Sequence, residues 1–146
     1  MSKSMRIKVD IARFKEQLRA TADEFNQATR PAAQAGAQII YDRAKLLVPV
    51  SSAAHNFYGT HAIYGPYNPG TLRNAIYQVF SKDNSFSDKS TYHVSWNKDK
   101  APYGHMVELG TRTAPAHSFI GAAVAETRQQ VRKAMKQRFI EEVSKK

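Results

Sequence analysis

Few residues in this chain have the type and spacing needed for chemistry, and the most obvious are its histidines. Only His105 has an acid at helical spacing, Glu108. A metal site needs three or more ligands that converge, whereas the histidines fall on different expected elements. We therefore expect no metal site and no cofactor. The five histidines are His55, His61, His93, His105 and His117.

Other catalytic arrangements are not indicated either. Paired catalytic carboxylates would need two acids in an apolar pocket, but Asp83, Asp88 and Asp99 lie in polar segments. The chain has no cysteine, which excludes a cysteine nucleophile, thiolate zinc sites and disulfides. It also contains no Gly-x-Ser-x-Gly, phosphate-cradling glycine loop or dinucleotide fingerprint. We therefore expect a protein that is not an enzyme.

Glu108 stands out among the acids because it lies between the apolar residues Val107 and Leu109. A charged group among apolar neighbours needs a partner. An ion pair or a contact with a helix terminus is favoured over catalysis. An enzyme acting through His105 and Glu108 stays an alternative that would require a convergent pocket.

Length and charge bound the class of protein. The chain has 146 residues, of which 42% are hydrophobic and 23% charged, as expected for one globular domain over residues 1–146. Its net charge of +10 is spread along the sequence, whereas a dedicated nucleic-acid binder more often has a dense basic stripe.

The first fifteen residues hold no apolar signal-peptide core, and the longest apolar run, 119–125, is far short of a membrane span. We expect a soluble protein without membrane contact.

The periodicity of apolar residues predicts the elements at the two ends of the chain. Steps of three and four from Ile11 to Phe25 predict an amphipathic helix with Asp10 as N-cap. Thr29–Pro31 should end it, because proline breaks helix interiors, and a second helix of small residues should follow to Leu47. A long helix is expected from Pro115 to about Val143.

The middle of the chain predicts a loop and a small sheet. Residues 50–70 contain turn-forming glycines and prolines and predict a long loop, either a floppy insertion or an adhesive surface. Strands are expected over 75–81, with apolar side chains buried on both faces, and over 91–96, paired as an antiparallel hairpin. Residues 103–109 fit a short strand or a helical turn. The order predicts an α+β fold: two N-terminal helices, a small antiparallel sheet of two to four strands and a long C-terminal helix.

Four segments together resemble a known family, the gene-product-ten-like tail-completion and neck proteins of lambdoid long-tailed phages. The most specific is 101–111, APYGHMVELGT, which is similar to the family's Tyr-Ala-x-x-Val-Glu-x-Gly-Thr box. Next is 115–120, PAHSFI, which runs into Ala122 and Ala123 and is similar to Pro-Ala-x-Pro-Phe-(Leu/Ile). The other two are 70–76, GTLRNAI, and the small-residue helix that ends with Ala44, Lys45 and Pro49. Ser118 departs from the family's proline, and residues 50–69 replace what is usually a few residues.

The resemblance implies a structural phage or prophage protein of the virion's tail and neck region, present in the host cytoplasm during assembly. Such a protein completes the head-proximal end of the tail and assists head–tail joining. Its implied partners are a tail terminator, tail tube and head connector, with copies in a homo-oligomeric ring, a hexamer that matches the tail, and non-specific contact with DNA crossing the channel. The alternative is a basic DNA-binding accessory protein. The expected interface residues are Phe57, Tyr58, Tyr64, Tyr67, Glu108, Thr111 and Arg112.

Overall fold

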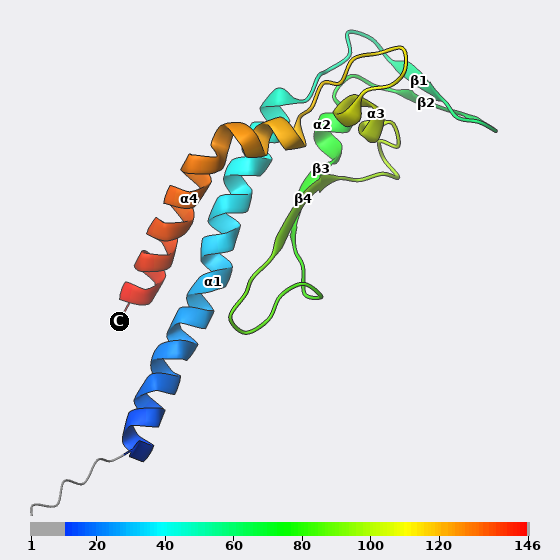
Figure 1. Ribbon diagram of the computed structural model, residues 1–146. Helices are drawn as coiled ribbons and strands as arrows, with labels where there is room; N and C mark the ends of the chain where they lie inside the picture. Colours follow the sequence, from blue (N-terminus) through cyan, green and yellow to red (C-terminus); the bar gives the residue numbers. More distant parts are fainter. Residues whose placement is uncertain (1–10, 146) are drawn as a thin grey trace, which may run out of the picture.

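The computed structural model describes residues 11–145 and confirms the α+β class (Figure 1). Two long helices lie side by side, and two small antiparallel sheets of two strands each follow one another along the chain between them. In this described part of the chain, no helix is long and apolar enough to cross a membrane. The elements are α1 (Ile11–Leu47), β1 (His55–Tyr58), β2 (Ile63–Tyr67), α2 (Thr71–Ala75), β3 (Ile76–Phe80), β4 (Tyr92–Trp96), α3 (Gly104–Leu109) and α4 (Ile120–Ser144).

The prediction of two N-terminal helices is wrong, because α1 runs without a break through Pro31. Proline removes one helical hydrogen bond, but packing on both sides of Pro31 holds the helix together. Ala28 and Ala32, on either side of Pro31 in the helix, are buried, and α4 packs along α1. On another side, the guanidinium of Arg30 lies 4.0 Å from the centre of the Phe80 ring. Tertiary contacts therefore override the local signal. The expected N-cap, Asp10, lies outside the described residues.

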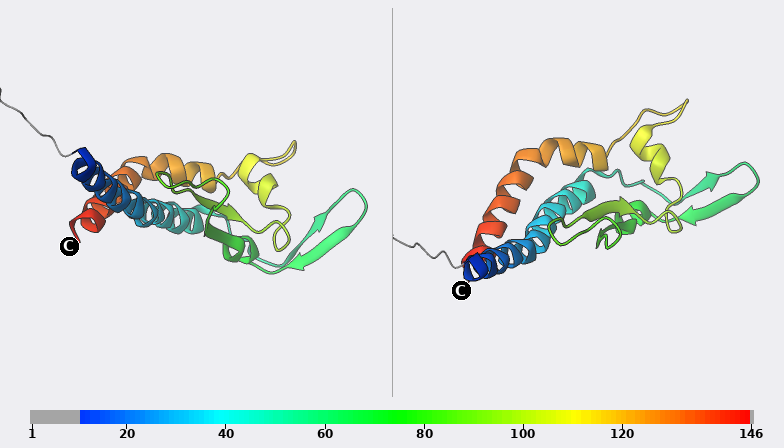
Figure 2. Two further views of the ribbon diagram at one scale, coloured as in Figure 1. Left: turned by 90° about the horizontal axis from the view of Figure 1, so that it is seen from below. Right: turned by 60° about the horizontal axis from the view of Figure 1, so that its bottom comes forward.

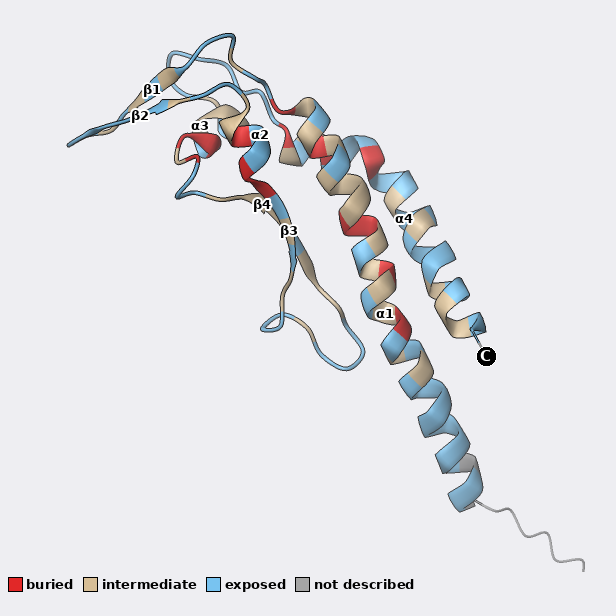
Figure 3. Cartoon of the chain, turned by 180° about the vertical axis from the view of Figure 1, so that it is seen from behind, coloured by how far each residue is buried: buried red, intermediate tan, exposed pale blue. Residues whose placement is uncertain are grey.

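The first third of α1 is helical as predicted, but two of its large apolar side chains, Leu18 and Phe25, do not enter the core. Leu18 is 54% exposed and Phe25 is 43% exposed. The ring of Phe25 makes one contact across to α4, with its centre 5.8 Å from that of Phe139. Figure 3 shows why, since α1 continues past the C-terminal end of α4, and within residues 11–145 no other element lies beside its first turns.

The pairing of β3 with β4 is antiparallel, as predicted, and joins Ile76 with Trp96 at one end and Phe80 with Tyr92 at the other. The expected burial on both faces is wrong. The face with Ile76 lies against α1, where the Gln78 amide donates to Gln38 Oε1 at 2.6 Å. The opposite face, with Tyr77 and Val79, is exposed, because α1 covers this sheet on one side alone.

Residues 50–70 are not the long loop that was expected, since they contain the antiparallel pair β1 and β2. The strands are short, and their turn is closed by a hydrogen bond of 2.9 Å from Gly59 N to Ala62 O. The glycine and proline at 65 and 66 hide the alternation that marks a strand. Figure 2 shows this hairpin projecting at the end of the molecule farthest from the start of α1.

The core lies where the end of α1, α2, the start of β3, the segment before α3 and the start of α4 meet. Phe119 is its largest fully buried side chain, and its ring lies 5.5 Å from that of Trp96. The predicted helix start at Pro115 is wrong, because α4 begins at Ile120. His117 N donates instead to Val107 O at 2.8 Å, which ties the preceding segment to α3.

Candidate interaction surface

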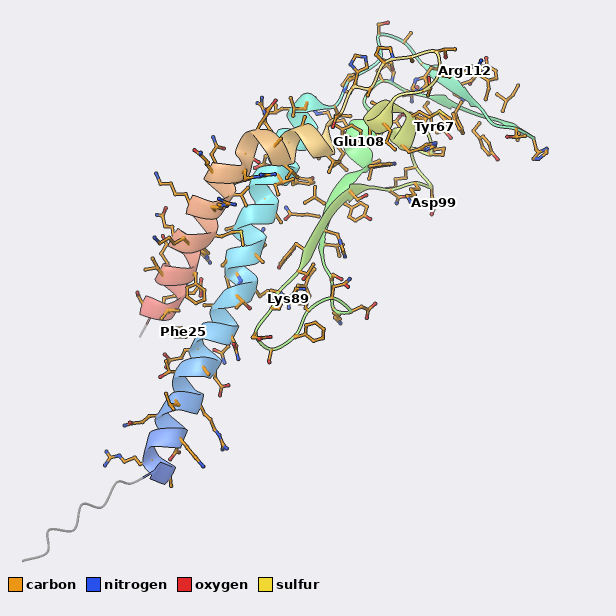
Figure 4. All side chains as sticks on the ribbon, in the orientation of Figure 1. Phe25, Tyr67, Lys89, Asp99, Glu108 and Arg112 are labelled. Carbon is orange, nitrogen blue, oxygen red and sulfur yellow. The ribbon has the colours of Figure 1, made fainter. Side chains whose placement is uncertain are left out.

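The carboxylate of Glu108 sits at the first turn of α4 and accepts four hydrogen bonds there (Figure 4). Oε2 accepts from the backbone N–H groups of Phe119 at 2.8 Å and Ile120 at 3.0 Å. Oε1 accepts from Gly121 N and from Ser118 Oγ, both at 2.9 Å. Helix N-termini present unpaired N–H groups and favour negative charge. Glu108 therefore caps α4, which confirms the favoured contact with a helix terminus.

The pKa of Glu108 is set by two opposing effects. Partial burial raises it, but the hydrogen bonds from Gly121, Ile120, Phe119 and Ser118 together outweigh burial and hold the pKa below the ordinary glutamate value. The carboxylate is thus kept charged by its partners. This is the electrostatic signature of a structural cap, since a general acid would need a raised pKa.

The structure does not build a reactive pair from His105 and Glu108. The His105 ring is exposed and its Nδ1 lies 2.9 Å from Pro102 O, while Glu108 faces α4. Among residues 11–145, no group of three or more histidines and acids is arranged to hold a metal ion.

Thr111 and Arg112 lie in the turn that follows α3, and their roles differ. Thr111 N donates to Ala114 O at 2.9 Å, and Thr111 Oγ1 accepts from Ala114 N at 3.1 Å, so this residue closes the turn. Gly110 enters it with φ of 80°, where a side chain would collide with Ala116 N at 2.7 Å. Arg112 is exposed and lies at the same end of the molecule as the β1–β2 hairpin (Figure 4).

The four aromatic residues expected at an interface separate into two pairs. Phe57 and Tyr67 pack against the core, and the Tyr67 ring lies 5.0 Å from that of Tyr103. Tyr58 and Tyr64 point outward, with 69% and 48% of their surfaces exposed. Ile63, which was not among the expected interface residues, pairs with Tyr58 and is 67% exposed. We call Tyr58, Ile63 and Tyr64 the hairpin tip.

A groove of about 320 Å³ lies beside the base of this hairpin. Phe57 lines one side and Pro115 and His117 line the other, with Met106 and Val107 of α3 also lining it. Its lining is mainly apolar. The hairpin tip and this groove present apolar and aromatic area without converging catalytic groups, with the cation of Arg112 at the same end of the molecule. Such a combination is typical of a surface that binds another protein.

The base of the hairpin also holds polar atoms without partners. Ser51 Oγ and His55 Nδ1 are buried, and neither has a hydrogen-bond partner among the described residues. Both residues line a second hollow of about 250 Å³ with Tyr103. Burial and the nearby Tyr67 raise the pKa of Tyr103 despite a backbone hydrogen bond from Leu72. Buried polar atoms such as Ser51 Oγ and His55 Nδ1 are normally paired with water or with polar groups of a partner.

Comparison of the chain with protein-family models, with curated proteins and with solved structures finds no match.

Proposed function

We propose that this chain is a structural protein of a tailed phage or prophage that completes the head-proximal end of the tail and assists head–tail joining. The observation that carries the proposal is the hairpin tip, whose three large side chains are 48–69% exposed on a hairpin that projects from one end of the molecule (Figure 2). Exposed apolar area of this kind marks a protein interaction site. The family resemblance of residues 101–111 and 115–123 indicates which kind of assembly the surface belongs to.

The hydrogen bonds between Glu108 and the start of α4 support this function because they fix one side of the groove beside the hairpin. Glu108 joins α3 to the start of α4, and His117 N bonds to Val107 O of α3, so both ends of the exposed turn around Arg112 are tied to α3. The groove beside the hairpin then has one rigid wall. A preformed surface loses less conformational entropy on binding. The proposed partners are the tail terminator, tail tube and head connector, with copies of the chain in a hexameric ring.

The second candidate is a basic DNA-binding accessory protein, and the net charge of +10 favours it. Exposed cations on α4 include Arg128, Lys133 and Lys136. In a neck protein, the same cations would serve acidic partner rings or DNA crossing the channel. DNA affinity that falls steeply with salt, in a protein that does not associate with tails, would favour the second candidate.

Shortening the three side chains of the hairpin tip should strongly weaken association with tails. We expect the triple variant Tyr58→Ser, Ile63→Ser, Tyr64→Ser to bind tails at least about 100-fold more weakly, because apolar anchors dominate protein interfaces. Tails that lack the protein would be mixed with the purified chain and sedimented, and the bound fraction measured at increasing protein concentration.

A matched control is available on the other sheet. Tyr77→Ser with Val79→Ser also removes exposed large side chains, on the face of β3 away from α1, and should leave tail binding unchanged. Equal binding of the triple variant and the wild type, with both folded by circular dichroism, would refute the assignment of the hairpin tip as the joining surface.

A further inference from the structure

Another groove, of about 460 Å³ and separate from the two hollows at the hairpin, lies between α1, α4 and β4. Its floor is α1, with Ala33, Ala37 and Ile40, and its far wall is α4, with Val124, Val131 and Met135. Val124 and Met135 remain partly exposed to solvent although they lie on the inner side of the helix. The groove therefore leaves apolar area uncovered in a place where another element would fit.

One wall of this groove is the outer edge of β4. Ser81 N bonds to Thr91 O and Asn97 N bonds to Ala75 O. Because hydrogen bonding alternates along an antiparallel pair, the backbone groups of Tyr92 and Val94 point away from β3. Within residues 11–145 no strand pairs with this edge. Such an edge is a template for another strand, and proteins usually cover it.

The groove and the edge together define the chemistry of an occupant. It must be an extended segment, so that its backbone can pair with β4. Its alternate side chains must be apolar, because the sheet face that carries Ile76 and Val94 turns toward α1. An extended segment in which apolar and polar residues alternate meets both requirements.

This chain contains such a segment at residues 5–9, outside the described part. Met5, Ile7 and Val9 alternate with Arg6 and Lys8. Strict alternation of apolar and charged residues is typical of a half-buried strand.

The segment cannot reach the groove of its own chain. At 1.5 Å per residue, Ala33 and Ala37 lie about 33–39 Å along α1 from Ile11. The four residues from Ile7 to Ile11 span at most about 14 Å. An occupant from this sequence must therefore come from a second copy.

We propose that residues 5–9 of one copy pair with the outer edge of β4 in a second copy. Met5, Ile7 and Val9 then fill the groove against α4, and Arg6 and Lys8 face solvent. This inference deepens the proposed function, on whose homo-oligomeric assembly it rests, by naming a contact between copies.

The absence of cysteine from the chain makes disulfide trapping a direct test. Ile7→Cys would be combined in turn with Tyr92→Cys, Val94→Cys and Trp96→Cys, to allow for different registers. Facing residues of paired strands lie within disulfide reach. We expect at least one pair to give a reducible link between copies on mild oxidation, both in the purified chain and in tails assembled with the variant. The control, Ile7→Cys with Val79→Cys on the exposed face of β3, should give none.

The result that would overturn the inference is the lack of any link between copies in all three variants, or links within a single chain alone. Ile7→Lys gives a second readout, since a buried lysine should lower the mass of the oligomer in sedimentation without reducing helicity. Comparing disulfide links with infectious titre distinguishes failure of this inference from failure of the proposed function. If infectious particles need the chain but no link forms, the strand contact is wrong and the function stands. If links form but infectious particles arise without the gene, the strand contact stands and the proposed function is wrong.

Discussion

Replacing Glu108 with alanine is expected to lower the free energy of unfolding by about 2–3 kcal/mol, because a charged cap with several hydrogen bonds is lost. Three backbone N–H groups at the start of α4 lose their acceptor, those of Phe119, Ile120 and Gly121. Chemical unfolding followed by circular dichroism would measure the effect. The control is Glu126→Ala, which removes an exposed ion pair with Arg43 and should cost less than about 1 kcal/mol.

The same carboxylate should make stability depend on pH. Since its pKa in the folded state is below that in the unfolded state, its contribution is complete above the unfolded value of about 4.3. That contribution is lost as the pH falls through the folded pKa, because protonation removes the charge that the N–H groups bind. Glu108→Gln lacks this titration. The gap in stability between wild type and Glu108→Gln should therefore narrow in acid, and a gap that stayed constant or widened would contradict the assigned role.

Replacing Phe119 with alanine is expected to have the largest effect on stability, a loss of about 3–5 kcal/mol. The side chain is fully buried and packs edge-on against Trp96. A loss of this size is a large part of the total for a small domain, so the variant should unfold partly at ordinary temperature. Urea titration would show the lowered midpoint, and Trp96, the single tryptophan, gives a fluorescence signal from the same contact.

Two further variants make this prediction specific. Phe119→Leu keeps most of the volume and should lose less stability than Phe119→Ala. Phe86→Ala removes a phenylalanine that is largely exposed, and should change stability by less than about 0.5 kcal/mol. Equal losses for Phe119→Ala and Phe86→Ala would show that the core is not centred on Phe119.

The sequence predicted the α+β order because most elements carry a local signal. The alternation over 91–96 identified β4, and Gly110 marked the end of α3. Two local signals were overridden by packing. Pro31 reads as a helix break, yet contacts with α4 and with Phe80 keep α1 continuous. Pro115 is typical of a helix start, but residues 117–121 donate hydrogen bonds to Val107 and Glu108, and α4 begins only at Ile120.

The candidate site was predictable only in part. The aromatic residues of 57–67 were identified, but periodicity cannot show which of them face out, because that depends on the hairpin's position over Tyr103. Ile63 was missed since a lone isoleucine in a Gly- and Pro-rich segment carries no signal. Glu108 could be flagged from its apolar neighbours, whereas its partners are ten or more residues away. Contacts across such distances are fixed by the fold and not by local pattern.

The measurement that tests the proposed function most directly is virion assembly with the gene for this chain disabled, in the phage or prophage that the proposal assigns to it. Electron microscopy of the lysate and infectious titre would be read together. We expect filled heads and separate tails to accumulate, with few infectious particles, and the purified chain to restore joining when added to that lysate. Normal yields of joined, infectious particles without the gene would contradict the assignment of this chain to head–tail joining.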